Sequence, residues 1–291
     1  MSMARRFLFL MSFFMLLLHA GPSESADVLI IGDAQLKPVA DLIAVIEGTL
    51  PSRTSAYSPS QINGRARAAV DEEGAKVVLA LGKDAVEVAA ALPESVPVVY
   101  GMLIAPPRTG RRNITGVYME TPVREYLDFV NRSFPGIKRI GVLYGEETER
   151  LVRAAESPQI RAVKVKNSYE FANAVGSLNT DALLLLPDRQ LLSPSAVEAA
   201  YLFSFSKKVP VLGLSEHHVK EGSLFALVFD LAGMGRQLGE LVKEVLAERS
   251  AVGIPPSPPR KLDLYVNADT ARKMGIHMPD EVMRRARRVF P

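Results

Sequence analysis

Cysteine is absent from this 291-residue sequence. Disulfide bonds, thiolate catalysis and cysteine-ligated metals are therefore excluded, and so is lipid attachment through an N-terminal cysteine. The chain is long enough for two domains of ordinary size, each able to bury a core that is stable without disulfides.

A strong excess of one charge sign is also missing. The formal net charge is +3, and the hydrophobic fraction of 48% is that of a globular protein. We therefore expect no nucleic-acid partner. The one local excess is the arginine group Arg284, Arg285, Arg287 and Arg288. We interpret it as a solvated helix face, with docking to an acidic surface or lipid headgroups as the alternative.

The usual catalytic motifs are missing as well. The sequence contains no Gly-x-Ser-x-Gly, no Gly-x-x-x-x-Gly-Lys-Ser/Thr and no His-Glu-x-x-His. His217 and His218 are adjacent, so they point in different directions, and no further cluster of metal ligands is visible. We expect no metal, no cofactor and no enzymatic activity. An enzyme on the same scaffold, with Asp33 as a carboxylate, is the weaker alternative.

The N-terminal segment has the three parts of a secretory signal peptide. Arg5 and Arg6 form a charged start, residues 7–18 an apolar stretch too short to span a bilayer, and residues 21–25 offer small side chains for cleavage. We expect export to the periplasm as a protein that is not a lipoprotein, with residues 1–25 as the signal peptide. Uncleaved anchoring is the alternative.

One pattern occurs twice in the remaining chain. Residues 77–101 and 182–214 each contain a continuous apolar run, a polar turn, an apolar-periodic segment and a second apolar run entered through Val-Pro. Runs of this kind are typical of strands buried on both faces, with a crossover helix between them. Each copy is therefore predicted to be a βαβ unit.

Two such units, about a hundred residues apart, predict two Rossmann-like α/β lobes with a ligand cleft between them. The first lobe is expected to contain residues 26–119 and about 231–261, and the second residues 120–230 and about 262–291. Three crossings would then join the lobes as a hinge. The predicted helices include 36–47, 58–74, 146–155, 234–248 and 280–288.

Several segments resemble the substrate-binding proteins of ABC importers, in the group that includes tryptophan- and tyrosine-binding members. They are Asn113-Ile-Thr-Gly-Val, Gly222-Ser-Leu-Phe-Ala-Leu with Asp230 and Gly235-Arg-Gln, and above all Val266-Asn-Ala-Asp-Thr-Ala-Arg-Lys-Met-Gly-Ile-His-Met-Pro. The resemblance implies a two-lobed fold of the periplasmic binding protein type I kind, without enzymatic activity, that delivers a small solute to a membrane permease.

Three positions depart from the family pattern. Gly82 is followed by Lys83 where relatives commonly carry a hydroxyl, Ala105-Pro106 stands where relatives often show Asp-Pro, and Tyr144-Gly145 replaces Tyr-Asn. Polar groups that would hold an amino acid are affected, so the resemblance does not transfer the identity of the ligand.

Candidate ligand-binding residues follow the predicted strands. Gly82 and Lys83 precede a helix whose backbone N–H groups suit a carboxylate or phosphate, and Asp188 could accept a bond from a ligand ammonium. Structural explanations stay open, since Gly82 could only make a turn and Asp188 could cap a helix. The remaining candidates are Asp33, Tyr100, Met102, Tyr144, Glu146, Thr148, Ser215 and Glu216.

These inferences predict a monomeric exported solute-binding component of an ABC-type importer. Its partners would be a small polar or aromatic metabolite and an ABC permease in the inner membrane, and its mechanism lobe closure on the ligand. A ligand-sensing periplasmic module that acts on a signalling receptor is the main alternative. If Lys83 and Asp188 face the cleft, replacing each by alanine is expected to weaken binding with little change in the unfolding midpoint.

Overall fold

The computed structural model describes residues 26–291, and its contacts divide the chain into two units. Unit 1 contains the described residues up to Met119 together with Met234–Ser257, and unit 2 contains Glu120–Gly233 and Pro258–Pro291. The chain therefore passes between the units three times. The predicted signal peptide lies outside the described residues. Within the described part of the chain, no helix has the length and hydrophobicity needed to cross a membrane.

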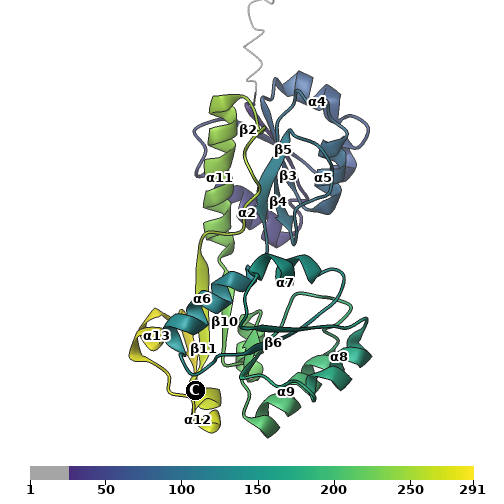
Figure 1. The fold of residues 1–291 in the computed structure, drawn as a ribbon. Helices are drawn as coiled ribbons and strands as arrows, with labels where there is room; N and C mark the ends of the chain where they lie inside the picture. The colour runs from purple at the N-terminus through teal and green to yellow at the C-terminus, as the bar shows by residue number, and fades with distance from the viewer. Residues whose placement is uncertain (1–25) are drawn as a thin grey trace, which may run out of the picture. The chain divides into compact units, whose positions relative to one another are not determined.

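Unit 1 contains a five-stranded parallel sheet with the order β2-β1-β3-β4-β5 (Figure 1). Its strands are β1 (Val28–Ile31), β2 (Thr54–Tyr57), β3 (Val77–Leu81), β4 (Val98–Leu103) and β5 (Ile114–Tyr118). Every residue of β1 and β3 is buried, because helices cover both faces of the sheet. This is the reason for the continuous apolar runs in the sequence.

The helices of unit 1 are α2 (Lys37–Glu47), α3 (Pro59–Ile62), α4 (Ala66–Glu73), α5 (Lys83–Ala90) and most of α11 (Leu231–Glu248). The α4 and α5 helices share a core with Leu29 and Ile31. On the other side of the sheet, α11 lies beside α2 (Figure 1). Gly235 makes this approach close, since a Cβ atom there would lie 2.8 Å from Val45 Cγ1.

The helix predicted over residues 58–74 is two helices. Ser58 begins α3 with a capping box, but the backbone turns at Gly64, which has a φ of +75°. A left-handed backbone conformation cannot continue a right-handed helix, so α4 starts anew at Ala66.

Unit 2 contains a seven-stranded sheet with the order β12-β11-β10-β9-β8-β6-β7, in which only the β10–β11 pair is antiparallel. Its strands are β6 (Ile140–Tyr144), β7 (Ile160–Lys164), β8 (Ala182–Leu184), β9 (Val211–Gly213), β10 (Phe225–Phe229), β11 (Leu262–Asn267) and β12 (Arg288–Phe290). Both predicted βαβ units are thus present, one in each sheet.

The helices of unit 2 are α6 (Val123–Ser133), α7 (Glu149–Ala155), α8 (Ser168–Val175), α9 (Pro194–Lys207), α10 (Glu216–Glu221), α12 (Ala268–Met274) and α13 (Asp280–Arg285). Buried residues of α6, α7, α12 and α13 share one core, and those of α8 and α9 share another with alternate residues of β6 and β8. The aromatic ring of Phe225 lies at the centre of the first core, in contact with Tyr126, Phe129 and Phe134.

Two helix predictions were wrong at their ends. The helix expected from Glu146 begins at Glu149, so Glu146 precedes it and does not gain from its macrodipole. The last helix ends at Arg285, and Arg288 belongs to a strand that pairs with β11. The arginine group is therefore not one helix face, since Arg287 pairs with Asp263 and Arg288 with Glu216.

Candidate ligand site

The strand order of unit 1 reverses between β1 and β3, because the chain runs from β1 to β2 on one side and then returns to β3 on the other. Connections that follow two such strands diverge, and the space between them is where open α/β sheets bind ligands. A hollow of about 460 Å³ lies at this position. Four predicted site residues line it: Asp33, Gly82, Lys83 and Met102.

Each of these four residues has a definite local cause for its position. Gly82 is the N-cap of α5 with a φ of +96°, which favours glycine. Lys83 extends into solvent with its Nζ 3.7 Å from a Glu87 carboxylate oxygen. Asp33 is half-buried, and its Oδ1 accepts a hydrogen bond of 3.1 Å from the N–H of Gln35.

Met102 has the most unusual backbone of the four. Its φ is +59°, a value that costs a non-glycine residue energy, and it lies where the pairing of β4 with β5 shifts register. Strained conformations of this kind occur at binding sites held by the surrounding structure. The strain is therefore a second feature that marks this hollow.

Sequence reasoning missed three further polar residues of this hollow: Ser58, Ser60 and Asp84. Ser58 and Ser60 follow β2, whose carboxyl end lies beside that of β1 because the two strands are parallel. The Ser-Pro-Ser-Gln segment from Ser58 has the pattern of a helix capping box, which by itself indicates only a helix start. Its position directly after a strand of the same sheet was the signal that could have identified these hydroxyl groups.

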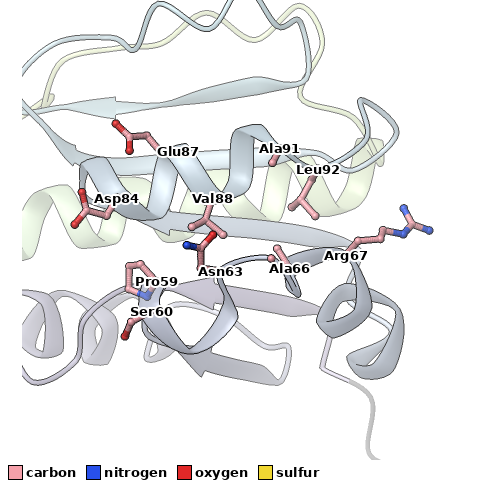
Figure 2. A pocket seen from close by; sticks show the side chains of 11 residues that line it. Pro59, Ser60, Asn63, Ala66, Arg67, Asp84, Glu87, Val88, Ala91 and Leu92 are labelled. Atoms are coloured by element: carbon pink, nitrogen blue, oxygen red, sulfur yellow. The ribbon is translucent and has the colours of Figure 1, made fainter.

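A second hollow of about 570 Å³ adjoins the first, and Pro59, Ser60 and Asp84 line both. Figure 2 shows it between α3 and α5, with Val88 and Asn63 facing one another across it. Its apolar lining includes Val88 of α5 together with Ala91 and Leu92, which follow that helix. Together the two hollows place charged and hydroxyl groups beside an apolar surface.

The corresponding reversal in unit 2 lies between β6 and β8, and here the candidate residues bind one another. Thr148 Oγ1 donates a hydrogen bond of 3.0 Å to Asp188 Oδ2 and accepts one of 3.1 Å from the N–H of Gly145. Asp188 Oδ1 accepts from the N–H groups of Gln190 and Leu191. Asp188 is only 3% exposed, so its polar atoms are used inside unit 2.

Gly145 explains one departure from the family pattern. A Cβ atom at this position would lie 2.7 Å from Asp188 Oδ2, closer than real Cβ contacts. An asparagine in its place would therefore displace the Asp188 carboxylate. The glycine and the internal Thr148–Asp188 bond belong together.

The other predicted residues have varied surroundings. Tyr100 is fully buried in the core of unit 1, and Tyr144 packs against the core of unit 2. Glu146 is exposed. Ser215 caps α10 by accepting from the N–H of His218, and Glu216 forms an ion pair of 2.7 Å with Arg288. None of these residues is among those that line the hollow of unit 1.

A buried ion pair was also missed. Glu120 is 4% exposed, and Arg150 on α7 binds both of its carboxylate oxygens, with 2.9 Å between Nη1 and Oε1. Burial raises the pKa of Glu120, and the guanidinium of Arg150 opposes that rise. Across residues 26–291, no group of three or more histidine or acidic side chains is arranged to hold a metal ion.

Two mainly parallel sheets with helices on both faces, joined by three passages of the chain, define a fold of the periplasmic binding protein type I kind. Residues 54–290 match the family model described as ABC transporter substrate binding protein. The chain therefore belongs to the family of ABC transporter substrate-binding proteins. Members of this family bind small molecules and work with an ABC permease, usually outside the cytoplasm.

Among curated proteins, the chain is similar to a tyrosine-binding protein of Clostridioides difficile, with 24% identity over 175 residues. The alignment covers 56% of this chain and 50% of that relative, so the chain spans about half the length of the relative.

Two solved structures show the same fold at low sequence identity. A ligand-free, open substrate-binding protein with adhesive properties from Clostridium difficile has a TM-score of 0.69 at 15% identity, covering 91% of this chain and 99% of that one. An ABC domain in complex with L-Trp from Streptococcus pneumoniae has a TM-score of 0.58 at 19% identity, covering 91% and 100%.

Proposed function

We propose that this chain is the exported solute-binding component of an ABC-type importer and that it binds a small metabolite, with an amino acid as the first candidate. The observation that carries the proposal is the hollow at the strand reversal of unit 1, where Asp33, Lys83 and the start of α5 meet. Lys83 and the N–H groups of α5 suit a carboxylate, and Asp33 suits an ammonium group. Opposite charges in one hollow favour a zwitterion.

An aromatic amino acid fits this proposal best. The adjoining hollow offers Val88, Ala91 and Leu92 as apolar contacts for a side chain. Two similar proteins, the tyrosine-binding protein and the ABC domain in complex with L-Trp, support the same ligand class. Tyr100 and Asp188, which are buried inside the units, are left out of the proposed ligand contacts.

A thermal-shift screen of the purified mature protein tests the ligand class. L-tyrosine, L-tryptophan, other amino acids, nucleosides and small organic acids would each be added at increasing concentration. A ligand of the folded state adds about 2.7 kcal/mol of stability at a concentration of 100 Kd, so the melting temperature should rise with the aromatic amino acids. A rise confined to nucleosides or organic acids would contradict the amino-acid proposal.

Site variants then locate the binding. Asp33→Asn should weaken the affinity for the amino acid measured by calorimetry, because the ammonium loses its charged partner. Glu244→Gln is the matched control, since Glu244 is an exposed carboxylate on α11 of the same unit. Equal affinities for wild type and Asp33→Asn would remove this hollow from the proposal.

Closure and transport need separate measurements. Ligand that favours a closed form shifts the equilibrium between open and closed states, so the radius of gyration from small-angle X-ray scattering should fall on binding. Deletion of the gene that encodes this chain should abolish uptake of the ligand by the host at low ligand concentration. Normal uptake combined with loss of a ligand-dependent signal would instead favour the sensory module.

A further inference from the structure

A separate hollow of about 610 Å³ lies on unit 2, between α9 and α10. Its volume is within the range of small-molecule pockets. None of the residues that line it belongs to the strand reversal described above. Those used below are Val197, Glu198, Tyr201, Leu202, Phe205 and Glu221, with two histidines beside them.

The α9 helix is apolar on two faces, although only one of them is needed for the core. Ala196, Ala200 and Phe203 are buried against unit 2. On the other face, Leu202 is 66% exposed and Phe205 is 45% exposed. Large apolar side chains that are exposed together on a soluble protein are typical of a binding surface.

The aromatic side chains of this hollow are held in place by their neighbours. The hydroxyl of Tyr201 donates to the carbonyl of His218 at 2.9 Å and lies 3.1 Å from Ser223 Oγ. The ring of Phe205 packs against the backbone of Gly222, where an added Cβ atom would meet it at 3.0 Å. A ligand would therefore meet rings that are already ordered, which lowers the entropy cost of binding.

The permanently charged side chains that line the hollow are carboxylates. Glu198 and Glu221 line it, and neither lysine nor arginine does. His218 accepts a hydrogen bond from the N–H of Leu214 through Nδ1, and burial lowers the pKa of its ring. At neutral pH this ring adds no positive charge. His217 lies 3.0 Å from Glu221 and is 73% exposed, so it is at the rim.

We propose that this hollow binds an organic ammonium ion that carries an aromatic or branched aliphatic group. Carboxylates attract the ammonium, the faces of Tyr201 and Phe205 contribute cation–π attraction, and Leu202 and Val197 contact the apolar group. The hollow is independent of the proposed amino-acid site, because all of its lining residues belong to unit 2.

Calorimetry of the mature protein with 2-phenylethylammonium as the probe tests this proposal. The uncharged 2-phenylethanol, which has the same carbon skeleton, should bind more weakly. Glu198→Gln or Glu221→Gln should each weaken binding of the probe by about threefold to fivefold, and the double variant by about tenfold, as expected for exposed charge pairs. Glu125→Gln, an exposed carboxylate on α6 of the same unit, should have no effect.

Three results would overturn the proposal. The first is equal binding of 2-phenylethanol, which would leave no role for the charge. The second is unchanged probe affinity in the double variant, or loss of probe binding in Asp33→Asn, which would place the probe elsewhere. The third is self-association in sedimentation analysis that Leu202→Ser abolishes while the probe fails to bind, which would assign the surface to a second copy of the chain.

Discussion

The two units treat the same topological position in different ways. Where the strand order of unit 1 reverses, Asp33 and Lys83 lie at the surface of a hollow. Where the order of unit 2 reverses, Thr148 and Asp188 bind one another and are buried. A polar residue at a strand end can therefore either line a hollow or hold its own loop in place, and its hydrogen-bond partners determine which of the two it does.

Individual ion pairs of the two units also differ in burial. In unit 1 the Lys37–Asp41 and Lys83–Glu87 pairs have side chains at least half exposed. Pairs of this kind contribute little to stability. In unit 2 the carboxylate of Glu120 is buried beside Arg150. We therefore expect loss of the Arg150 partner of Glu120 to be costly and loss of an exposed partner such as Lys83 to be nearly neutral.

Asp188→Ala should have the largest effect. The substitution removes the acceptor for Thr148 Oγ1 and for two backbone N–H groups, all in a buried loop. The free energy of unfolding should fall by about 3 kcal/mol, measured by urea denaturation followed by circular dichroism. An Asp188 side chain that faced a cleft would instead leave the unfolding midpoint nearly unchanged. Asp128→Ala, at an exposed position of α6, is the control and should change stability by less than about 0.5 kcal/mol.

The sequence reveals the sheets more readily than these roles. Continuous apolar runs such as 77–81 identify buried strands, and Gly82 and Lys83 after the run are placed at its carboxyl end by simple continuation. The partner of Asp188 is 40 residues away in the sequence, so its burial depends on how two loops meet. Local patterns contain no such information.

Two other features of unit 1 have a local signal in the sequence. The Asn63-Gly64 pair is a turn signal inside the helix predicted over residues 58–74, and the helix is interrupted there. Tyr100 continues the alternation of β4 that places Val98 in the core cluster, so its inward position follows from the period of a strand.

Arg150→Met should have the second largest effect. The substitution leaves the Glu120 carboxylate buried without its charged partner. Because Arg150 is 40% exposed, we expect a loss of about 2 kcal/mol at pH 7, below the full value for a buried pair. Arg153→Met is the matched control on α7, since its partner Glu149 is closer to solvent. Equal losses in the two variants would contradict the comparison.

The same pair gives a dependence on pH with a definite sign. The pKa of Glu120 is raised in the folded state, chiefly by burial, so folded protein binds more protons than unfolded protein just above the ordinary carboxyl pKa. The contribution of Glu120 to stability should therefore fall as pH rises through that interval. Glu120→Gln should remove this fall when unfolding free energies are compared across pH values. A contribution that increases with pH would show that the Arg150 interaction outweighs burial.

Gly145→Ala should have the third largest effect on stability. Its comparison with Gly82→Ala separates the cost of crowding from the cost of backbone strain. The added methyl would lie 2.7 Å from Asp188 Oδ2, which predicts a loss of about 2 kcal/mol through overpacking. Gly82→Ala in unit 1 meets no atom within 4 Å, but its φ of +96° predicts a loss of about 1 kcal/mol from strain. In the double variant Gly145→Ala/Asp188→Ala the clash is absent. Its loss of stability should therefore be smaller than the sum of the losses of the two single variants. Strict additivity in urea denaturation would mean that the two residues do not interact.

Lys83→Ala should have the smallest effect on stability and still affect function. Lys83 is 82% exposed and its Nζ lies 3.7 Å from Glu87, so the free energy of unfolding should change by less than about 0.5 kcal/mol. If Lys83 contacts the carboxylate of an amino acid, affinity measured by calorimetry should fall by about fivefold. Lys243→Ala, an exposed lysine on α11, should change neither quantity. Lower stability without lower affinity would reverse the comparison, because Lys83 would then support its own unit as Asp188 does.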